Sequence, residues 1–177
     1  MFLADGFEET EAIAPLDMLR RANADVKTVS ISDSLSVKGA HGISVCADLV
    51  ISDIKNEAPE MIILPGGMPG TKNLNMCEPL KKLLTSTYEN GGYVCAICAA
   101  PMVLGGLGLL KGKKATCFPG FEEHLLEAVV TNKKVVRDGK IITACGMGVA
   151  IEFGAELVAA LKGKLEAERI IKAIQKD

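Results

Sequence analysis

The residue best suited to covalent chemistry is Cys98, which opens the segment Cys98-Ala99-Ala100-Pro101. The five apolar residues before it, 93–97, predict a buried strand, and Pro101 favours the first turn of a helix. We therefore expect Cys98 on a sharp turn between strand and helix, the cysteine version of the elbow that presents a nucleophile. Because a helix N-terminus carries unpaired N–H groups and a partial positive charge, the pKa of this thiol is expected below the free value of about 8.5.

The alternative interpretation is that Cys98 is a small buried hydrophobe, as most cysteines are. Cys95 keeps that interpretation because it lies inside the predicted strand. A dithiol redox pair is disfavoured, since the first cysteine of such a C-x-x-C motif stands at the exposed start of a helix. A zinc site is disfavoured as well, because only His41 and His124 are available to complete one. We therefore expect no metal, no cofactor and free thiols throughout.

A glycine-rich loop, Leu64-Pro65-Gly66-Gly67-Met68-Pro69-Gly70, follows another predicted strand. In an open parallel sheet this loop would lie at the same carboxyl edge as Cys98, where such folds bind ligands. Its glycines let the backbone approach a reacting carbonyl, so the N–H groups of Gly67 and Ala99 are candidates for holding an oxyanion. A plain turn is the alternative for a Gly-Gly pair.

Three carboxylates, Glu8, Glu9 and Glu11, follow the first predicted strand within four residues. An exposed acidic helix start is the simplest explanation, because the helix dipole favours it. If one of them turns inward beside the thiol, burial would raise its pKa. It could then donate a hydrogen bond to the sulfur or accept a substrate proton. Spacing alone does not identify which glutamate that would be.

The segments that would position these residues alternate between short apolar runs, which are typical of strands, and segments with apolar residues at helical spacing. This pattern predicts a doubly wound α/β fold with a mostly parallel sheet and helices on both faces. The predicted strands are 1–4, 26–31, 61–64, 93–97 and 115–118, and the predicted helices are those around Leu16, after Pro79, from Val149 to near Gly163, and through Ile170. Residues 135–143 predict a hairpin in which Asp138 and Gly139 both take positive φ.

Length and composition narrow the classes of protein and partner. With 177 residues and no linker or repeat, residues 1–177 are interpreted as one domain. The formal net charge of -2 and the scattered basic residues disfavour a nucleic-acid partner. No apolar run approaches the roughly 20 residues that span a bilayer, so we expect no membrane association and a cytoplasmic location. The first strand has only four apolar residues before Asp5 and looks clipped, which suggests that a few residues precede it.

Four segments together resemble the ThiJ/PfpI superfamily, in the branch of the Parkinson-disease-associated protein deglycase. They are residues 5–11 (DGFEETE), 64–67 (LPGG), 96–101 (AICAAP) and 146–153 (GMGVAIEF). The resemblance implies a flavodoxin-like sandwich and a homodimer. It also implies that Cys98 is the nucleophile, Glu11 its partner carboxyl, and Gly66 and Gly67 the oxyanion loop. The positions of Arg20, Arg21, His41, Cys46 and Met147 lie at or near the dimer contact in relatives.

Two positions depart from related proteins. Ala99 follows the cysteine where the intracellular peptidase branch has histidine, so a Cys-His pair is absent at this place and peptidase activity is not expected. Phe118 stands where glyoxalase-active relatives carry histidine, and there it would line the substrate pocket. His124, six residues further on, is interpreted as an exposed helix residue.

Two functions of different classes fit these residues. The first is a cofactor-independent enzyme of carbonyl stress, in which Cys98 adds to a small aldehyde substrate such as methylglyoxal or glyoxal, or to their early adducts, and Glu11 moves the proton. This is a glyoxalase or deglycase type of reaction. The second is a non-enzymatic redox sensor or chaperone-like protein, in which Cys98 is oxidised to a sulfinate held by Glu11.

Overall fold

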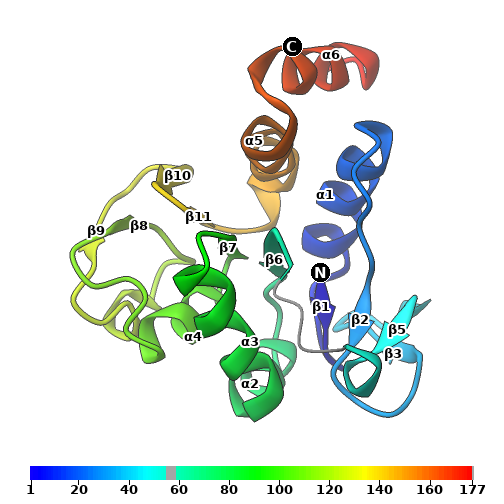
Figure 1. The fold of residues 1–177 in the computed structure, drawn as a ribbon, viewed down its shortest axis with the longest axis vertical. Helices are drawn as coiled ribbons and strands as arrows, with labels where there is room; N and C mark the ends of the chain where they lie inside the picture. Colours follow the sequence, from blue (N-terminus) through cyan, green and yellow to red (C-terminus); the bar gives the residue numbers. More distant parts are fainter. Residues whose placement is uncertain (55–58, 177) are drawn as a thin grey trace.

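The computed structural model describes residues 1–54 and 59–176, and its ribbon is drawn in Figure 1. A central parallel sheet carries helices on both faces. The strands of the two sheet segments are β1 (Phe2–Leu3), β2 (Val29–Ser30), β5 (Leu49–Val50), β6 (Met61–Leu64), β7 (Tyr93–Ile97), β10 (Val135–Asp138) and β11 (Ile141–Ala144). Two small pairs lie beside them, β3 (Ser36–Lys38) with β4 (Ser44–Cys46), and β8 (Lys114–Ala115) with β9 (Val129–Val130).

The strand order runs β5-β2-β1 in one segment and β6-β7-β11-β10 in the other, and β1 contacts β6 where the two segments meet. All pairs in these segments are parallel except β10 with β11, which forms an antiparallel edge. Because parallel strands end at a common edge, the loops after β1, β6 and β7 converge there. This confirms the doubly wound α/β architecture expected from the alternating pattern.

The helices divide between the two faces of the sheet (Figure 1). One face is covered by α1 (Glu9–Arg21), α5 (Ala150–Lys162) and α6 (Lys164–Ala173), and the other by α2 (Gly70–Met76), α3 (Glu78–Glu89) and α4 (Pro101–Gly106). Three short 3₁₀ helices, η1 (Ile51–Asp53), η2 (Glu122–His124) and η3 (Met147–Val149), lie in connections. Each face has its own core, which is mostly aliphatic but includes Phe7 and Phe153 on one face and Phe2 on the other.

The first helix is fixed by packing at its centre. Acidic residues occupy its first turn and Arg20 and Arg21 its last turn, which suits the helix dipole. Pro15 lies inside the helix and removes one backbone donor. A side chain at Gly154 of α5 would lie 3.1 Å from the Pro15 Cα and 2.6 Å from the Met18 Sδ. This close approach of α5 holds the start of α1 at the carboxyl edge of the sheet.

The predicted hairpin is present, but its turn differs from the expected one. Asp138 pairs with Ile141, so the two loop residues are Gly139 and Lys140 rather than Asp138 and Gly139. Gly139 has a φ of 62°, whereas Asp138 is the last strand residue. The Asp138 carboxylate accepts a 2.9 Å hydrogen bond from the amide of Lys114. That bond keeps Asp138 in the strand and ties β10 to β8.

Other predicted elements also have different boundaries in the structure. The strand predicted at 115–118 is only β8, and it pairs with β9 in a separate ribbon instead of joining the main sheet. The β3–β4 hairpin and α2 were not predicted, because neither has a strong apolar period. Among the described residues, no helix combines the length and the apolar character needed to cross a membrane.

Candidate active site

Cys98 stands on the turn between β7 and α4, as the sequence indicated. Its φ is 64°, a left-handed conformation that is uncommon for a residue with a side chain. Two backbone hydrogen bonds hold it there: its amide donates to the Ala144 oxygen at 2.9 Å, and its oxygen accepts from the Phe118 amide at 2.8 Å. Strain of this kind persists only where the surroundings fix it, and it is frequent at functional sites.

The electrostatic surroundings of the thiol differ from the expectation. Burial, followed by the charge of the Glu11 carboxylate, raises the pKa of the Cys98 thiol to about 12. The amides of Ala99 and Gly67 donate toward the sulfur and oppose this rise without cancelling it. The predicted low pKa was therefore wrong. Helix α4 has only six residues and begins at Pro101, so its dipole is too small and too distant to outweigh desolvation.

Glu11 is the carboxyl that reaches the thiol. It is fully buried in the first turn of α1, and its Oε2 accepts a 2.9 Å hydrogen bond from the amide of Gly66. Burial raises the pKa of Glu11 to about 7, against opposing contributions from the Cys98 thiol and the Gly66 amide. Oε1 has no hydrogen-bond partner among the described residues. The structure thus places at the thiol the glutamate that the family resemblance had selected.

Gly66 and Gly67 allow this close approach. A side-chain carbon at Gly66 would lie 2.6 Å from the Cys98 Cβ and 2.6 Å from the Glu11 Oε2, so only glycine fits between them. Gly67 has a φ of 90°, and a side chain there would overlap the backbone of Glu8. The two glycines have different hydrogen-bonding roles. The Gly66 amide is committed to Glu11, whereas the Gly67 amide is directed at the sulfur.

Phe118 lies beside the elbow through its backbone bond to Cys98, and its ring is exposed. A side chain at Gly146 would lie 3.2 Å from this ring. Phe121 contacts it edge-on, with ring centroids 6.5 Å apart. His124 ends η2 and packs near Phe121, so it lies on a short helix as expected but is half-buried rather than fully exposed.

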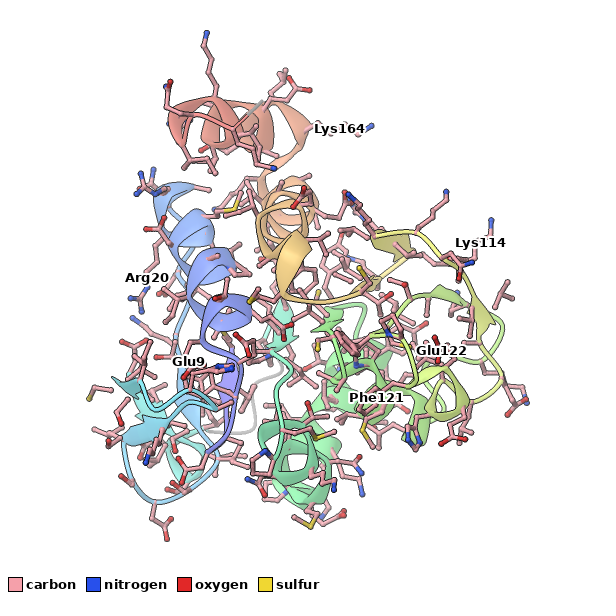
Figure 2. All side chains as sticks on the ribbon, turned by 180° about the vertical axis from the view of Figure 1, so that it is seen from behind. Glu9, Arg20, Lys114, Phe121, Glu122 and Lys164 are labelled. Carbon is pink, nitrogen blue, oxygen red and sulfur yellow. The ribbon has the colours of Figure 1, made fainter. Side chains whose placement is uncertain are left out.

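The acidic segment contains a second buried carboxylate that sequence reasoning did not anticipate. Glu9 turns inward toward the β3–β4 hairpin, where its Oε1 accepts a hydrogen bond from the His41 amide at 2.8 Å, and its Oε2 lies 2.9 Å from the His41 Nδ1 (Figure 2). The sequence expectation was that at most one glutamate is buried, because nothing in the local pattern connects Glu9 with residues more than thirty positions away. A prediction of the β3–β4 hairpin would have indicated this contact, because its turn carries His41.

The remaining residues singled out by the resemblance are at the surface. Arg20 pairs with Asp48 at 2.9 Å, and Arg21 pairs with Asp17. Cys46 and Met147 are exposed. All six cysteines are free, and Cys95 is buried within β7, as predicted.

Comparison with known proteins agrees with this geometry. The model of the DJ-1/PfpI family matches residues 1–160. Protein DJ-1 homolog B of Arabidopsis thaliana is 42% identical over 170 residues, which are 95% of this chain but 39% of the plant protein. The chain therefore spans well under half the length of that relative. The glutathione-independent glyoxalase DJR-1.2 of Caenorhabditis elegans is 32% identical over 169 residues, covering 94% of this chain and 89% of the nematode protein.

The solved structures give the same result. Toxoplasma gondii DJ-1, in an oxidized form, superposes with a TM-score of 0.95 at 35% identity and covers 99% of this chain and 96% of its own. The match therefore includes the sheet, the start of α1 that carries Glu11, and the turns that carry Cys98 and Gly66. On the family match, the sequence relatives and the shared fold, the chain belongs to the DJ-1/PfpI family.

Proposed function

We propose that the protein is a cofactor-independent cysteine enzyme that converts small 2-oxoaldehydes, or their early adducts on amines and thiols, to hydroxy acids. One observation carries the proposal. A buried carboxyl with a pKa of about 7 lies beside a thiol on a strained turn. A general base is most effective when its pKa is near the operating pH, so Glu11 suits proton transfer near neutrality.

The first chemical step needs no preformed thiolate. The Cys98 sulfur attacks the aldehyde carbon of methylglyoxal while the thiol proton passes to the Glu11 carboxylate. A C–S bond forms, the carbonyl π bond breaks, and the oxygen takes the negative charge. The amides of Gly67 and Ala99, which donate toward the sulfur, would stabilise that oxygen in the proposed reaction. Transfer of this proton from Glu11 to the oxygen gives a hemithioacetal and restores the Glu11 carboxylate.

The second stage moves hydrogen between adjacent carbons. Glu11 takes the proton from the former aldehyde carbon, and the electron pair passes through an enediol to the neighbouring carbonyl. Return of the proton to the second carbon, together with transfer of the hydroxyl proton from the first carbon's oxygen to the second carbon's oxygen, gives a thioester of lactate. Water then cleaves the thioester, releasing lactate and restoring the thiol. The steps consume one methylglyoxal and one water for each lactate, with no net oxidation and no cofactor.

The relative from Caenorhabditis elegans supports this substrate class, because it is described as a glutathione-independent glyoxalase. Action on early protein adducts, the deglycase reaction, differs in its first step: the C–S bond forms as the C–N bond of the adduct breaks, and the amine leaves with the thiol proton passed on by Glu11. The later steps are the same. In the absence of histidine next to the cysteine, hydrolysis of peptides has no corresponding base.

The test is lactate formation from methylglyoxal by the purified chain without glutathione. We expect turnover in the wild type and its loss in Cys98→Ser. Cys46→Ser is a matched control, because Cys46 is an exposed thiol outside the site and its replacement should leave the rate unchanged. Equal rates in Cys98→Ser and the wild type would contradict the proposal, as would a wild type that forms no lactate.

A second function, redox sensing, is favoured by the Glu11 Oε1, which lacks a hydrogen-bond partner within the described part of the chain, and by the oxidized Toxoplasma relative. In this reaction one hydrogen peroxide converts the thiol to a sulfenic acid and water, and a second gives the sulfinic acid. A protonated Glu11 could then donate its hydrogen to a sulfinate oxygen. Mass spectrometry after mild peroxide treatment, run beside the lactate assay, separates the two functions. Selective gain of two oxygens at Cys98 without lactate turnover would favour the sensor.

A further inference from the structure

The β8–β9 ribbon has an outer edge with free backbone groups. β9 bonds to β8 on one side only. The Val129 amide donates to the Lys113 oxygen at 2.8 Å, and the Thr131 amide donates to the Ala115 oxygen at 2.9 Å. Because every second residue of an edge strand directs its backbone groups outward, the N–H and C=O of Val130 point away from β8. No residue that the structure describes bonds to either group.

The side chains along this edge are apolar and exposed. Val129 and Val130 are 52% and 40% exposed, and Leu126, just before the strand, is 54% exposed. Valine favours the extended conformation, which keeps the segment in strand geometry. An exposed strand edge of this kind is a ready template for pairing with a further strand. The edge is therefore suited to an extended peptide.

Lysines lie at both ends of the edge. Lys114 of β8 is the ladder neighbour of Val129, and Lys133 and Lys134 follow β9 closely in the sequence. All three lysines are exposed. The ion pairs formed within residues 1–54 and 59–176 include none of them. Their charges are therefore available to a partner.

This edge is remote from the dimer contact expected around α1. In Figure 1 the β8–β9 ribbon and α1 lie on opposite sides of β6 and β7. Figure 2 agrees, since Lys114 and Arg20 lie on opposite sides of the molecule. Ala115 of β8 belongs to one core, whereas α1 packs on the other. A dimer formed through α1 would therefore leave the ribbon exposed.

The charge selects the kind of strand that can pair here. Lysines on an edge oppose pairing with an identical edge, because like charges repel. A strand that carries glutamates or aspartates has the complementary charge, and opposite charges on neighbouring strands stabilise the pair. A nucleic acid fits less well, since residues 126–134 include no aromatic side chain for base stacking. Lipid headgroups lack the alternating donors and acceptors of a strand.

From these observations we propose that the outer edge of β9 binds an acidic, extended peptide segment of another protein by strand addition. The peptide backbone would exchange hydrogen bonds with the N–H and C=O of Val130. Its apolar side chains would pack on Val129, and its carboxylates would face the three lysines. In this mode of recognition the main-chain bonds give affinity and the side chains give specificity. The interaction is separate from the reaction at Cys98.

The test is fluorescence anisotropy of a labelled synthetic peptide of alternating glutamate and valine, titrated with the purified chain. We expect saturable binding of this peptide and none of the matching peptide of alternating lysine and valine. The glutamate–valine peptide methylated at every amide nitrogen should also fail to bind, because it has no backbone donors. Since the charged groups are exposed, binding should weaken as the salt concentration rises.

Charge reversals in the chain locate the binding surface. Lys133→Glu with Lys134→Glu should weaken peptide binding by at least about tenfold, because two exposed ion pairs are replaced by repulsion. Lys72→Glu with Lys82→Glu is the matched control. These two lysines are exposed, lie on α2 and α3, and give the same change in net charge. The control should bind the peptide like the wild type.

A proline tests the backbone bond directly. Val130→Pro removes the outward N–H, and proline is tolerated on an edge strand where that group faces solvent. This variant should lose measurable binding, whereas Val130→Thr keeps the N–H and should bind like the wild type. Thermal unfolding shows whether each variant is folded. If Val130→Pro is unfolded, the charge reversals and the methylated peptide decide the question.

Several results would overturn the proposal. They are no binding of the glutamate–valine peptide by the wild type, equal binding of the lysine–valine peptide or of the methylated peptide, and affinity that survives Lys133→Glu with Lys134→Glu. Tighter binding of phosphatidylserine vesicles or of single-stranded DNA through the same lysines would also overturn it, and would identify a lipid or a nucleic acid as the partner.

Discussion

The amide of Gly66 donates a 2.9 Å hydrogen bond to the Glu11 Oε2, and the same glycine leaves no room for a side chain between Glu11 and Cys98. The acid and the nucleophile come from α1 and from the end of β7, and the loop after β6 joins them. The distance between the two reacting groups therefore depends on a residue that takes no part in the chemistry.

Gly66→Ala tests this dependence. The new methyl group would lie 2.6 Å from both the Cys98 Cβ and the Glu11 Oε2, so one of them must move. We expect lactate turnover to fall by about 100-fold, because small misplacements of reacting groups have effects of this size. Gly106→Ala is the control, since its nearest neighbour is 4.0 Å away. If both variants keep wild-type turnover, the packing argument is wrong.

Glu11→Gln separates thiol acidity from catalysis. The carboxylate charge is the second contribution, after burial, to the high pKa of Cys98. Its removal should lower the pKa of the thiol, read from the ultraviolet absorbance of the thiolate. Turnover should nevertheless fall by about 10²- to 10⁴-fold, because the general base is lost. A higher thiol pKa in the variant would mean that a protonated Glu11 stabilises the thiolate in the wild type.

The buried carboxyl also makes stability depend on pH. The pKa of Glu11 rises from 4.5 to about 7 on folding, so between these values the folded state holds a proton that the unfolded state has lost. Stability should be unaffected below pH 4.5, fall as pH rises toward 7, and stay reduced above it. The full loss is about 3 kcal/mol, since one pKa unit is about 1.4 kcal/mol.

Denaturant unfolding at a series of pH values can measure this effect. The free energy of unfolding of Glu11→Gln, relative to the wild type, should increase by about 3 kcal/mol between pH 4 and pH 8. A difference that is independent of pH would show that Glu11 titrates normally in the folded protein.

Phe118→His tests whether turnover is limited by the absence of a second general base, the histidine that glyoxalase-active relatives carry at this position. A phenylalanine cannot move the proton between the two substrate carbons, so Glu11 acts alone and turnover of free methylglyoxal should be weak. The Phe118 amide donates to the Cys98 oxygen, so this position adjoins the turn that carries the thiol. We expect kcat to rise more than KM changes, because a general base acts on the chemical step. Unchanged kcat in a folded variant would indicate that another group supplies the base.

We propose that a second copy of the chain covers the outer face of α1. A groove of about 900 Å³ there is lined by Ile13, Met18, Ile43 and Ile151. Ile13 and Ile43 are 43% and 59% exposed, an apolar pairing that suits a protein partner. Light scattering should give a dimer for the wild type and a monomer for Ile13→Glu with Ile43→Glu. Leu165→Glu, at an exposed position on α6, is the control and should stay dimeric. A monomeric wild type would contradict the expectation.

The sequence by itself determined the α/β alternation, β6 and β7 to the residue, and the turn that carries Cys98. Apolar runs and a proline after two small residues are local signals, and local signals specify strands and turns. The family motifs added the choice of Glu11 among the glutamates. Other features needed the assembled fold, because they depend on contacts between distant segments. Desolvation raised the pKa of Cys98 against the helix dipole, and the β3–β4 hairpin buried Glu9 against His41. Neither effect has a local signature, since burial is a property of the packed chain and not of any single segment.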